Sequence, residues 1–185
     1  SAVMKNGNGA KTEFWSDTYR EYIRTITFGN DLSNLPSSCT GDSDLCWDIS
    51  YSSTQNKKVY AYLIDSGLDY TDSDSVSHDL YNLYIVSEVP IFAPTSCYVM
   101  FSGFTNLISI DFNDNFNTSN VTDMRGMFAK NSSLISLNLN GFNVSKVQTM
   151  DAMFYRCSSL TSIDLSSFNT VSVTDMDAMF DGCSS

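Results

Sequence analysis

The second half of the chain repeats one pattern of hydrophobic positions every 26 residues. Aligned positions hold the same apolar residue in three successive copies, among them Phe116/Phe142/Phe168, Val121/Val147/Val173, Met124/Met150/Met176, Met127/Met153/Met179 and Phe128/Phe154/Phe180. A unit of this length has an apolar stripe too narrow to form its own core, so it buries that stripe against the next unit. The pattern therefore predicts a solenoid of stacked units.

Each unit contains two patterns that predict different local structures. The pattern L-x-x-L-x-L, with Ile at one place in the second copy, occupies Leu134–Leu139 and Leu160–Leu165 and indicates a short strand with one inward face. Apolar residues from Val121 to Phe128 are spaced by 3, 3 and 1, which favours a short helix capped by Thr122 or Asp123. We therefore expect a leucine-rich-repeat-like solenoid with a short strand plus a short helix in each repeat.

Residues 1–97 show no period and are predicted to form an α+β leader that caps the repeats. A short helix is expected over Ser16–Arg24, and strands are expected over Thr25–Phe28, Cys46–Tyr51, Val59–Ile64 and Leu80–Val86. Their sheet should run into the first strand of the solenoid, residues 98–185, and cover its apolar end. The third unit stops before its L-x-x-L-x-L, so we expect the array to continue past residue 185.

The amino-acid sequences of the repeats resemble those of a known family. They read FNTSNVTDMRGMFAKNSSLISLNL, FNVSKVQTMDAMFYRCSSLTSIDL and FNTVSVTDMDAMFDGCSS. These segments resemble the leucine-rich repeats of BspA-like bacterial surface proteins. There are two departures, since Asn131 stands where the later units have Cys157 and Cys183, and the third unit stops before its L-x-x-L-x-L. The resemblance implies a secreted or surface-attached scaffold that takes part in adhesion, without implying a particular ligand.

Charge and hydropathy exclude two classes of partner. The chain has 21 acidic and 10 basic residues, a net charge of -11, and no basic tract, which argues against nucleic-acid binding. No apolar run approaches the roughly 18 residues of a membrane-spanning helix, so no membrane insertion is expected in this segment. The resemblance implies instead a partner that is a protein or glycoprotein of a host or neighbouring cell.

The outward positions of the predicted solenoid strands are the candidate ligand-binding residues. They are Ser109, Asp111, Ser136, Asn138, Ser162 and Asp164. Small polar residues make weak contacts, since tight protein interfaces favour Trp, Tyr and Arg. We therefore expect low affinity per unit, with avidity from many repeats. The alternative is a structural surface spacer without its own ligand.

Four of the five cysteines fall into two pairs, and the fifth is Cys97. Cys39 and Cys46 flank a polar loop, and their separation of seven residues predicts a disulfide in an oxidising compartment. Cys157 and Cys183 share one repeat position and are expected to be buried free thiols. No C-x-x-C site is present, so zinc is not expected.

An acidic run from Asp65 to Asp79 holds five aspartates and the only histidine, His78. The spacing of Asp69, Asp72 and Asp74 allows calcium binding but lacks the glycine and distal glutamate of an EF-hand, which favours a solvated acidic loop. Nothing near His78 supplies a nucleophile signature. We expect no catalytic residue, metal or cofactor, and a hydrolase is the least favoured class.

Overall fold

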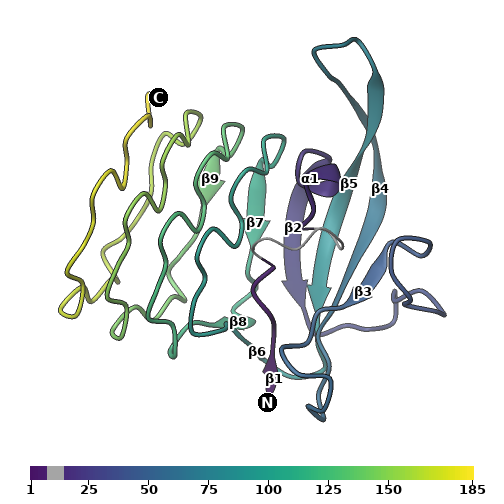
Figure 1. Ribbon diagram of the computed structural model, residues 1–185, viewed down its shortest axis with the longest axis horizontal. Helices are drawn as coiled ribbons and strands as arrows, with labels where there is room; N and C mark the ends of the chain where they lie inside the picture. The colour runs from purple at the N-terminus through teal and green to yellow at the C-terminus, as the bar shows by residue number, and fades with distance from the viewer. Residues whose placement is uncertain (8–14) are drawn as a thin grey trace.

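The computed structural model describes residues 1–7 and 15–185 and is built almost entirely from β-structure (Figure 1). Its elements are β1 (Ala2–Val3), α1 (Asp17–Arg20), β2 (Ile23–Gly29), β3 (Cys46–Asp48), β4 (Tyr60–Thr71), β5 (Ser77–Val86), β6 (Ile91–Phe92), β7 (Ser109–Asp111), β8 (Phe116–Asn117) and β9 (Ser136–Leu137). A six-stranded sheet has the order β3-β4-β5-β2-β7-β9, and a three-stranded sheet has the order β1-β6-β8. In the described residues, no helix is long and apolar enough to cross a membrane.

The larger sheet continues from the leader into the repeats. Strand β2 lies between β5 and β7 and pairs in parallel with both, so that Ile26 is opposite Leu83 on one side and Ile110 on the other. Strand β9 then pairs in parallel with β7, with Leu137 opposite Ile110. The inward side chains of leader and repeats therefore belong to one hydrophobic core.

The predicted helix in each repeat is wrong, and with it the leucine-rich-repeat-like fold of alternating strand and helix. In the described residues the only α-helix is α1, a single turn in the leader. Between Val121 and Phe128 the backbone N–H groups of alternate residues donate to the next coil, for example Gly126 to Asp151 at 2.8 Å and Phe128 to Met153 at 3.0 Å. A helix would direct these groups to the residue four positions earlier in the same segment.

Tight turns, and not a helix, produce the spacing of the apolar residues between Val121 and Phe128. The N–H of Met127 donates to the carbonyl of Met124 at 3.2 Å, which closes a tight turn and directs both side chains inward. Gly126 inside this turn has φ of 58°, and its equivalents Ala152 and Ala178 have φ of 53° and 52°. A left-handed residue at this position in each coil interrupts a right-handed helix.

The leader is likewise β-structure rather than α+β. The helix expected over Ser16–Arg24 is reduced to α1, and β2 already begins at Ile23. Strands do form within the other segments expected to be extended, and β4 runs further than expected, to Thr71. The β4–β5 hairpin projects beyond the rest of the sheet (Figure 1).

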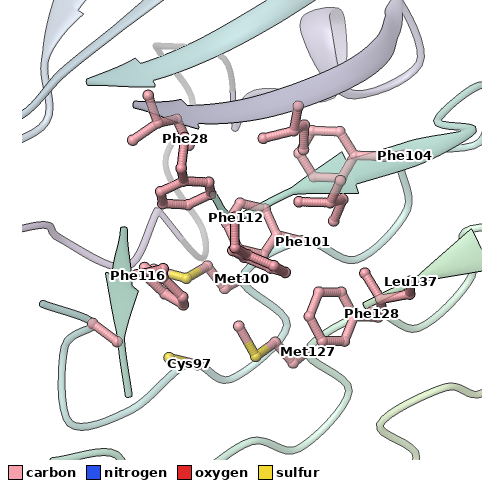
Figure 2. Close-up of a cluster of buried hydrophobic side chains, with 14 of the residues drawn as sticks. Phe28, Cys97, Met100, Phe101, Phe104, Phe112, Phe116, Met127, Phe128 and Leu137 are labelled. Atoms are coloured by element: carbon pink, nitrogen blue, oxygen red, sulfur yellow. The ribbon is translucent and has the colours of Figure 1, made fainter. Parts of the chain in front are cut away.

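Stacked aromatic rings connect the coils through the core. Phe101, Phe128, Phe154 and Phe180 lie one coil apart, with ring centroids separated by 6.1, 5.8 and 5.4 Å in turn. Figure 2 shows the leader's Phe28 close to the first rings of this stack, and its ring meets Phe101 edge-on at 6.2 Å. Because each ring contacts the equivalent ring of its neighbour, burial in one coil depends on the next.

Candidate binding surface

The candidate residues lie in register along the six-stranded sheet. Ser109 of β7 is opposite Ser136 of β9, and Asp111 ends β7 two residues later. Of the six candidates only Ser109 is half-buried, and the others are exposed. The third coil repeats the pattern at Ser162 and Asp164, although no strand is formed there. The structure thus places the six residues on one surface, as the alternation along each strand predicts.

Sequence reasoning missed the contribution of the leader to this surface. Thr25 and Thr27 of β2 are paired with Ser109 and Asp111, so the row of small polar residues begins before the repeats. Thr25 also donates from its hydroxyl to Oδ1 of Asn82 at 2.7 Å. The alternation of Thr25 and Thr27 around a buried Ile26 is the signal that would have found them. We call the surface formed by these residues and the six candidates the strand face.

Three of the candidates also hold turns. One side-chain oxygen in each accepts the backbone N–H two residues later, as seen for Asp111 and Asn113 at 2.9 Å and for Asn138 and Asn140 at 3.0 Å. Hydrogen bonds from Ser166, first from its side chain and then from its backbone N–H, hold the pKa of Asp164 below its ordinary value. The second carboxylate oxygen of Asp111 and the side-chain nitrogen of Asn138 take no part in these turns.

A cleft of about 280 Å³ lies between the turn after β7 and the equivalent turn of the next coil. Its polar lining includes Asp111 and Asn138, whereas Ser162 and Asp164 do not line it. The side chains of Phe112 and Phe142 contribute its apolar lining and are more than nine-tenths buried. Carboxylate and amide groups above an apolar floor suit a ligand with hydroxyl or amide groups. The volume is at the lower limit for a ligand pocket, so one small group would fill it.

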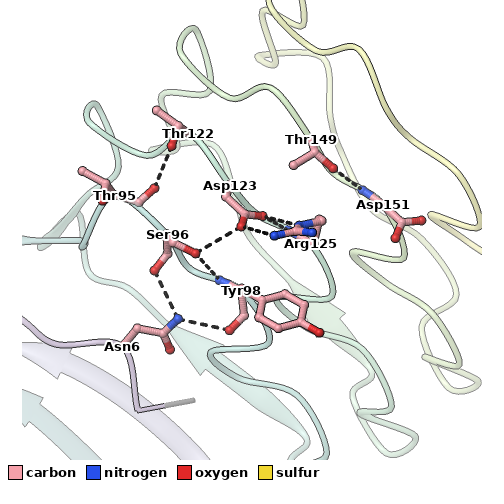
Figure 3. A network of polar contacts seen from close by, with 9 residues as sticks. All are labelled: Asn6, Thr95, Ser96, Tyr98, Thr122, Asp123, Arg125, Thr149 and Asp151. Atoms are coloured by element: carbon pink, nitrogen blue, oxygen red, sulfur yellow. Dashed lines mark hydrogen bonds and ion pairs between the residues drawn. The ribbon is translucent and has the colours of Figure 1, made fainter. Parts of the chain in front are cut away.

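The coils present a second polar surface, which the sequence did not single out (Figure 3). Asp123 is bridged in parallel to Ser96 on one side and to Thr149 on the other. Arg125 binds both carboxylate oxygens of Asp123, with N–O distances of 3.0 and 2.8 Å, and its guanidinium lies over the ring of Tyr98. Although burial alone would raise the pKa of Asp123, hydrogen bonds from Arg125 bring it below its ordinary value.

The two groups of cysteines have different surroundings. In the structure a disulfide joins Cys39 and Cys46, whose Cα atoms are 4.8 Å apart. Cys97, Cys157 and Cys183 are free thiols, of which Cys183 is only half-buried. Burial raises the pKa of Cys157 to about 11, which makes this thiol a poor nucleophile at neutral pH.

The acidic run forms the end of the β4–β5 hairpin and is not a loop. Nε2 of His78 lies 2.8 Å from Oδ2 of Asp72, and the His78 ring stacks on Tyr22. Asp69 accepts a hydrogen bond from Ser77, and Asp72 also accepts the N–H of Asp74. Within the described residues no group of three His, Cys, Asp or Glu side chains is placed to hold a metal ion.

The comparison with known families concerns the repeats alone. Residues 95–185 match a family described as Mycoplasma protein of unknown function, DUF285. No curated protein and no solved structure matches the chain. The family match is consistent with a bacterial surface repeat protein and does not extend to the BspA-like leucine-rich repeats. The matched residues make up just under half of the chain.

Proposed function

We propose that the chain is a non-enzymatic binding module of a cell surface or secreted protein, and that it uses the strand face for adhesion. Its partner is a protein or glycan of a host or neighbouring cell. The Cys39–Cys46 disulfide supports this location, since such bonds persist in oxidising compartments outside the cytosol.

The observation that carries the proposal is the register of the strand face. Thr27, Asp111 and Asn138 stand at equivalent places on successive strands or coils, and the sheet beneath them is packed on buried Ile110 and Leu137. Binding groups repeated on a rigid scaffold suit a ligand that is itself repetitive or extended, such as a glycan chain or a fibrous protein. The cleft beside Asp111 and Asn138 adds one concave subsite.

A structural spacer is the second candidate, and one observation favours it. The strand face contains no Trp, Tyr or Arg among its eight residues, and three of its side chains each commit an oxygen to a turn. Such a surface provides few anchors for a tight complex. A spacer would need only the stacked coils.

The two candidates are separated by a binding screen with face-specific variants. The protein is tested against immobilised glycans and extracellular-matrix glycoproteins, beside the double variant Ser136→Arg/Ser162→Arg, which adds bulk to two exposed positions of the strand face. Gln148→Arg is the matched control, because this exposed residue belongs to the surface of Thr149 and Asp123.

Binding that the double variant loses and the control retains would support adhesion through the strand face. Binding that survives in the double variant would reject the strand face as the site. Absence of binding to every immobilised molecule would favour the spacer.

A further inference from the structure

The outer edge of the β4–β5 hairpin pairs with no other strand near the hairpin end, within the part of the chain that the structure describes. We call residues 64–82 the arm. Strand β3 pairs with β4 only up to Tyr62, and the N–H of Leu63 donates to the carbonyl of Leu45 at 2.9 Å. Beyond Leu63 no described strand pairs with this edge of β4, and the arm projects past the remaining sheet (Figure 1).

The hydrogen bonds on either side of this edge determine the direction in which its backbone groups point. The N–H of Leu63 points outward, away from β5. Backbone groups of successive residues in a strand point to opposite edges, so the N–H and C=O of Asp65 also point outward. A bulge follows, and the N–H groups of Gly67 and Leu68 are occupied by the side chains of Asp65 and Ser66.

Beyond the bulge the edge is open again. The N–H of Asp72 donates across the hairpin to Val76 at 3.0 Å, so the backbone groups of Asp69 and Thr71 point outward. An unpaired strand edge is a template for an added strand unless charge, proline or a bulge protects it.

The two faces of the arm differ in chemistry. Ile64 and Leu68 are opposite Asn82 and Leu80, so they share one face, and they are 44% and 48% exposed. Asp65 and Asp69 pair with Tyr81 and Asp79 on the other face. An added strand at this edge would meet apolar side chains on one face and carboxylates on the other.

We propose that the outer edge of the arm binds an extended segment of a partner protein as an added strand, and that this segment alternates Lys or Arg with apolar residues. Main-chain hydrogen bonds to Asp69 and Thr71 supply the pairing, and alternate side chains supply the specificity. The arm has five aspartates and no Lys or Arg, so a second copy of this chain is repelled and a basic segment is attracted. This site lies outside the repeats and does not rest on the function proposed for the strand face.

The test uses three short synthetic peptides of equal length. One alternates Lys and Val, the second has the same composition in two blocks, and the third alternates Glu and Val. Fluorescence anisotropy measures their binding to the intact protein, and amide hydrogen exchange is followed at Asp69 and Thr71. We expect the alternating basic peptide to bind at least about tenfold more tightly than the others and to slow both amides.

Matched variants distinguish pairing with the arm from non-specific attraction of a basic peptide to an acidic protein. Asp65→Asn/Asp69→Asn should weaken binding about tenfold, whereas Asp175→Asn/Asp177→Asn removes the same charge from exposed positions outside the arm and the strand face and should leave binding unchanged. Leu68→Ser should also weaken binding, since it removes the exposed apolar contact.

Equal binding of the alternating and block peptides would overturn the proposal, as would equal loss in the two Asp→Asn pairs. Slow exchange at Asp69 and Thr71 that depends on protein concentration, without peptide, would mean that a second copy of the chain occupies the edge, and this too would overturn it.

Discussion

The buried amide of Asn131 donates a hydrogen bond to the backbone carbonyl of Phe101 at 2.8 Å. Its side-chain oxygen accepts the N–H of Phe104 at 2.9 Å. One coil later the thiol of Cys157 donates to the carbonyl of Phe128 at 3.1 Å. The repeat position that departs from cysteine therefore keeps the same contact between coils, and asparagine adds a second one.

Asn131→Leu tests this contact because it removes both polar atoms and keeps the number and branching of the side-chain heavy atoms. The variant leaves the carbonyl of Phe101 and the N–H of Phe104 without their partner, and each unsatisfied buried group costs about 1–3 kcal/mol. We expect the free energy of unfolding in urea to fall by about 2–4 kcal/mol. Asn140→Leu, at an exposed turn, should stay within about 0.5 kcal/mol of the parent. Equal effects of the two changes would contradict the assigned role of Asn131.

Met153→Ala tests whether the coils depend on one another. Met153 is fully buried in the middle coil, and its equivalents Met127 and Met179 are buried one coil away on either side. The lost transfer energy and the cavity should reduce stability by about 2–4 kcal/mol, measured by denaturant unfolding. Ser136→Ala on the strand face is the control and should cost less than about 0.5 kcal/mol.

Hydrogen exchange on the Met153→Ala variant gives the second measurement. Faster exchange should extend into the coils of Met127 and Met179, because a shared cavity weakens both neighbours. Loosening confined to residues 142–165 would mean that the coils fold independently.

The free thiols should differ in their rates of alkylation. Cys157 is fully buried with a pKa raised to about 11 by burial, and burial followed by the charge of Asp123 also raises the pKa of Cys97. We expect iodoacetamide at about pH 8 to modify the half-buried Cys183 first, and to reach the other two only on unfolding. Peptide mass mapping measures the order, and early labelling of Cys157 would be incompatible with its burial.

The Cys39–Cys46 disulfide should form whenever the protein is exported to an oxidising compartment. It closes a short loop, and loop-closure entropy indicates a contribution of about 2 kcal/mol. Mass analysis without reductant should show these two cysteines in one linked peptide, and Cys39→Ser should lower stability by that amount. Two free thiols in protein made under oxidising conditions would reject the assignment.

The repeat period and the leader strands could be predicted from sequence because both are local hydrophobic patterns. The inward direction of Met124, Met127 and Phe128 was also implied by their spacing. The spacing did not determine the backbone conformation of this segment. A short helix and a series of turns both place side chains on one side at the same intervals. The choice is made by hydrogen bonds between residues about 25 positions apart, such as Gly126 to Asp151, which no local pattern records.

The strand face was predicted in part for the same reason. Alternation around buried Ile110 and Leu137 identified the outward positions of the repeats. Pairing of β2 with β7 joins Thr25 and Thr27 to them, and that pairing connects segments more than eighty residues apart. The acidic composition of residues 65–79 indicated a solvated loop, whereas the cross-strand pairs, such as Tyr70 with His78, make it a hairpin.

Solution NMR of the backbone from Val121 to Phe128 tests the central claim most directly, namely that the repeats are helix-free coils joined by parallel hydrogen bonding. We expect close contacts between the amide of Met124 and the backbone of Thr149, and between the amide of Met150 and the backbone of Asp175. Helical chemical shifts with contacts between residues three and four apart, and no contacts between coils, would contradict it.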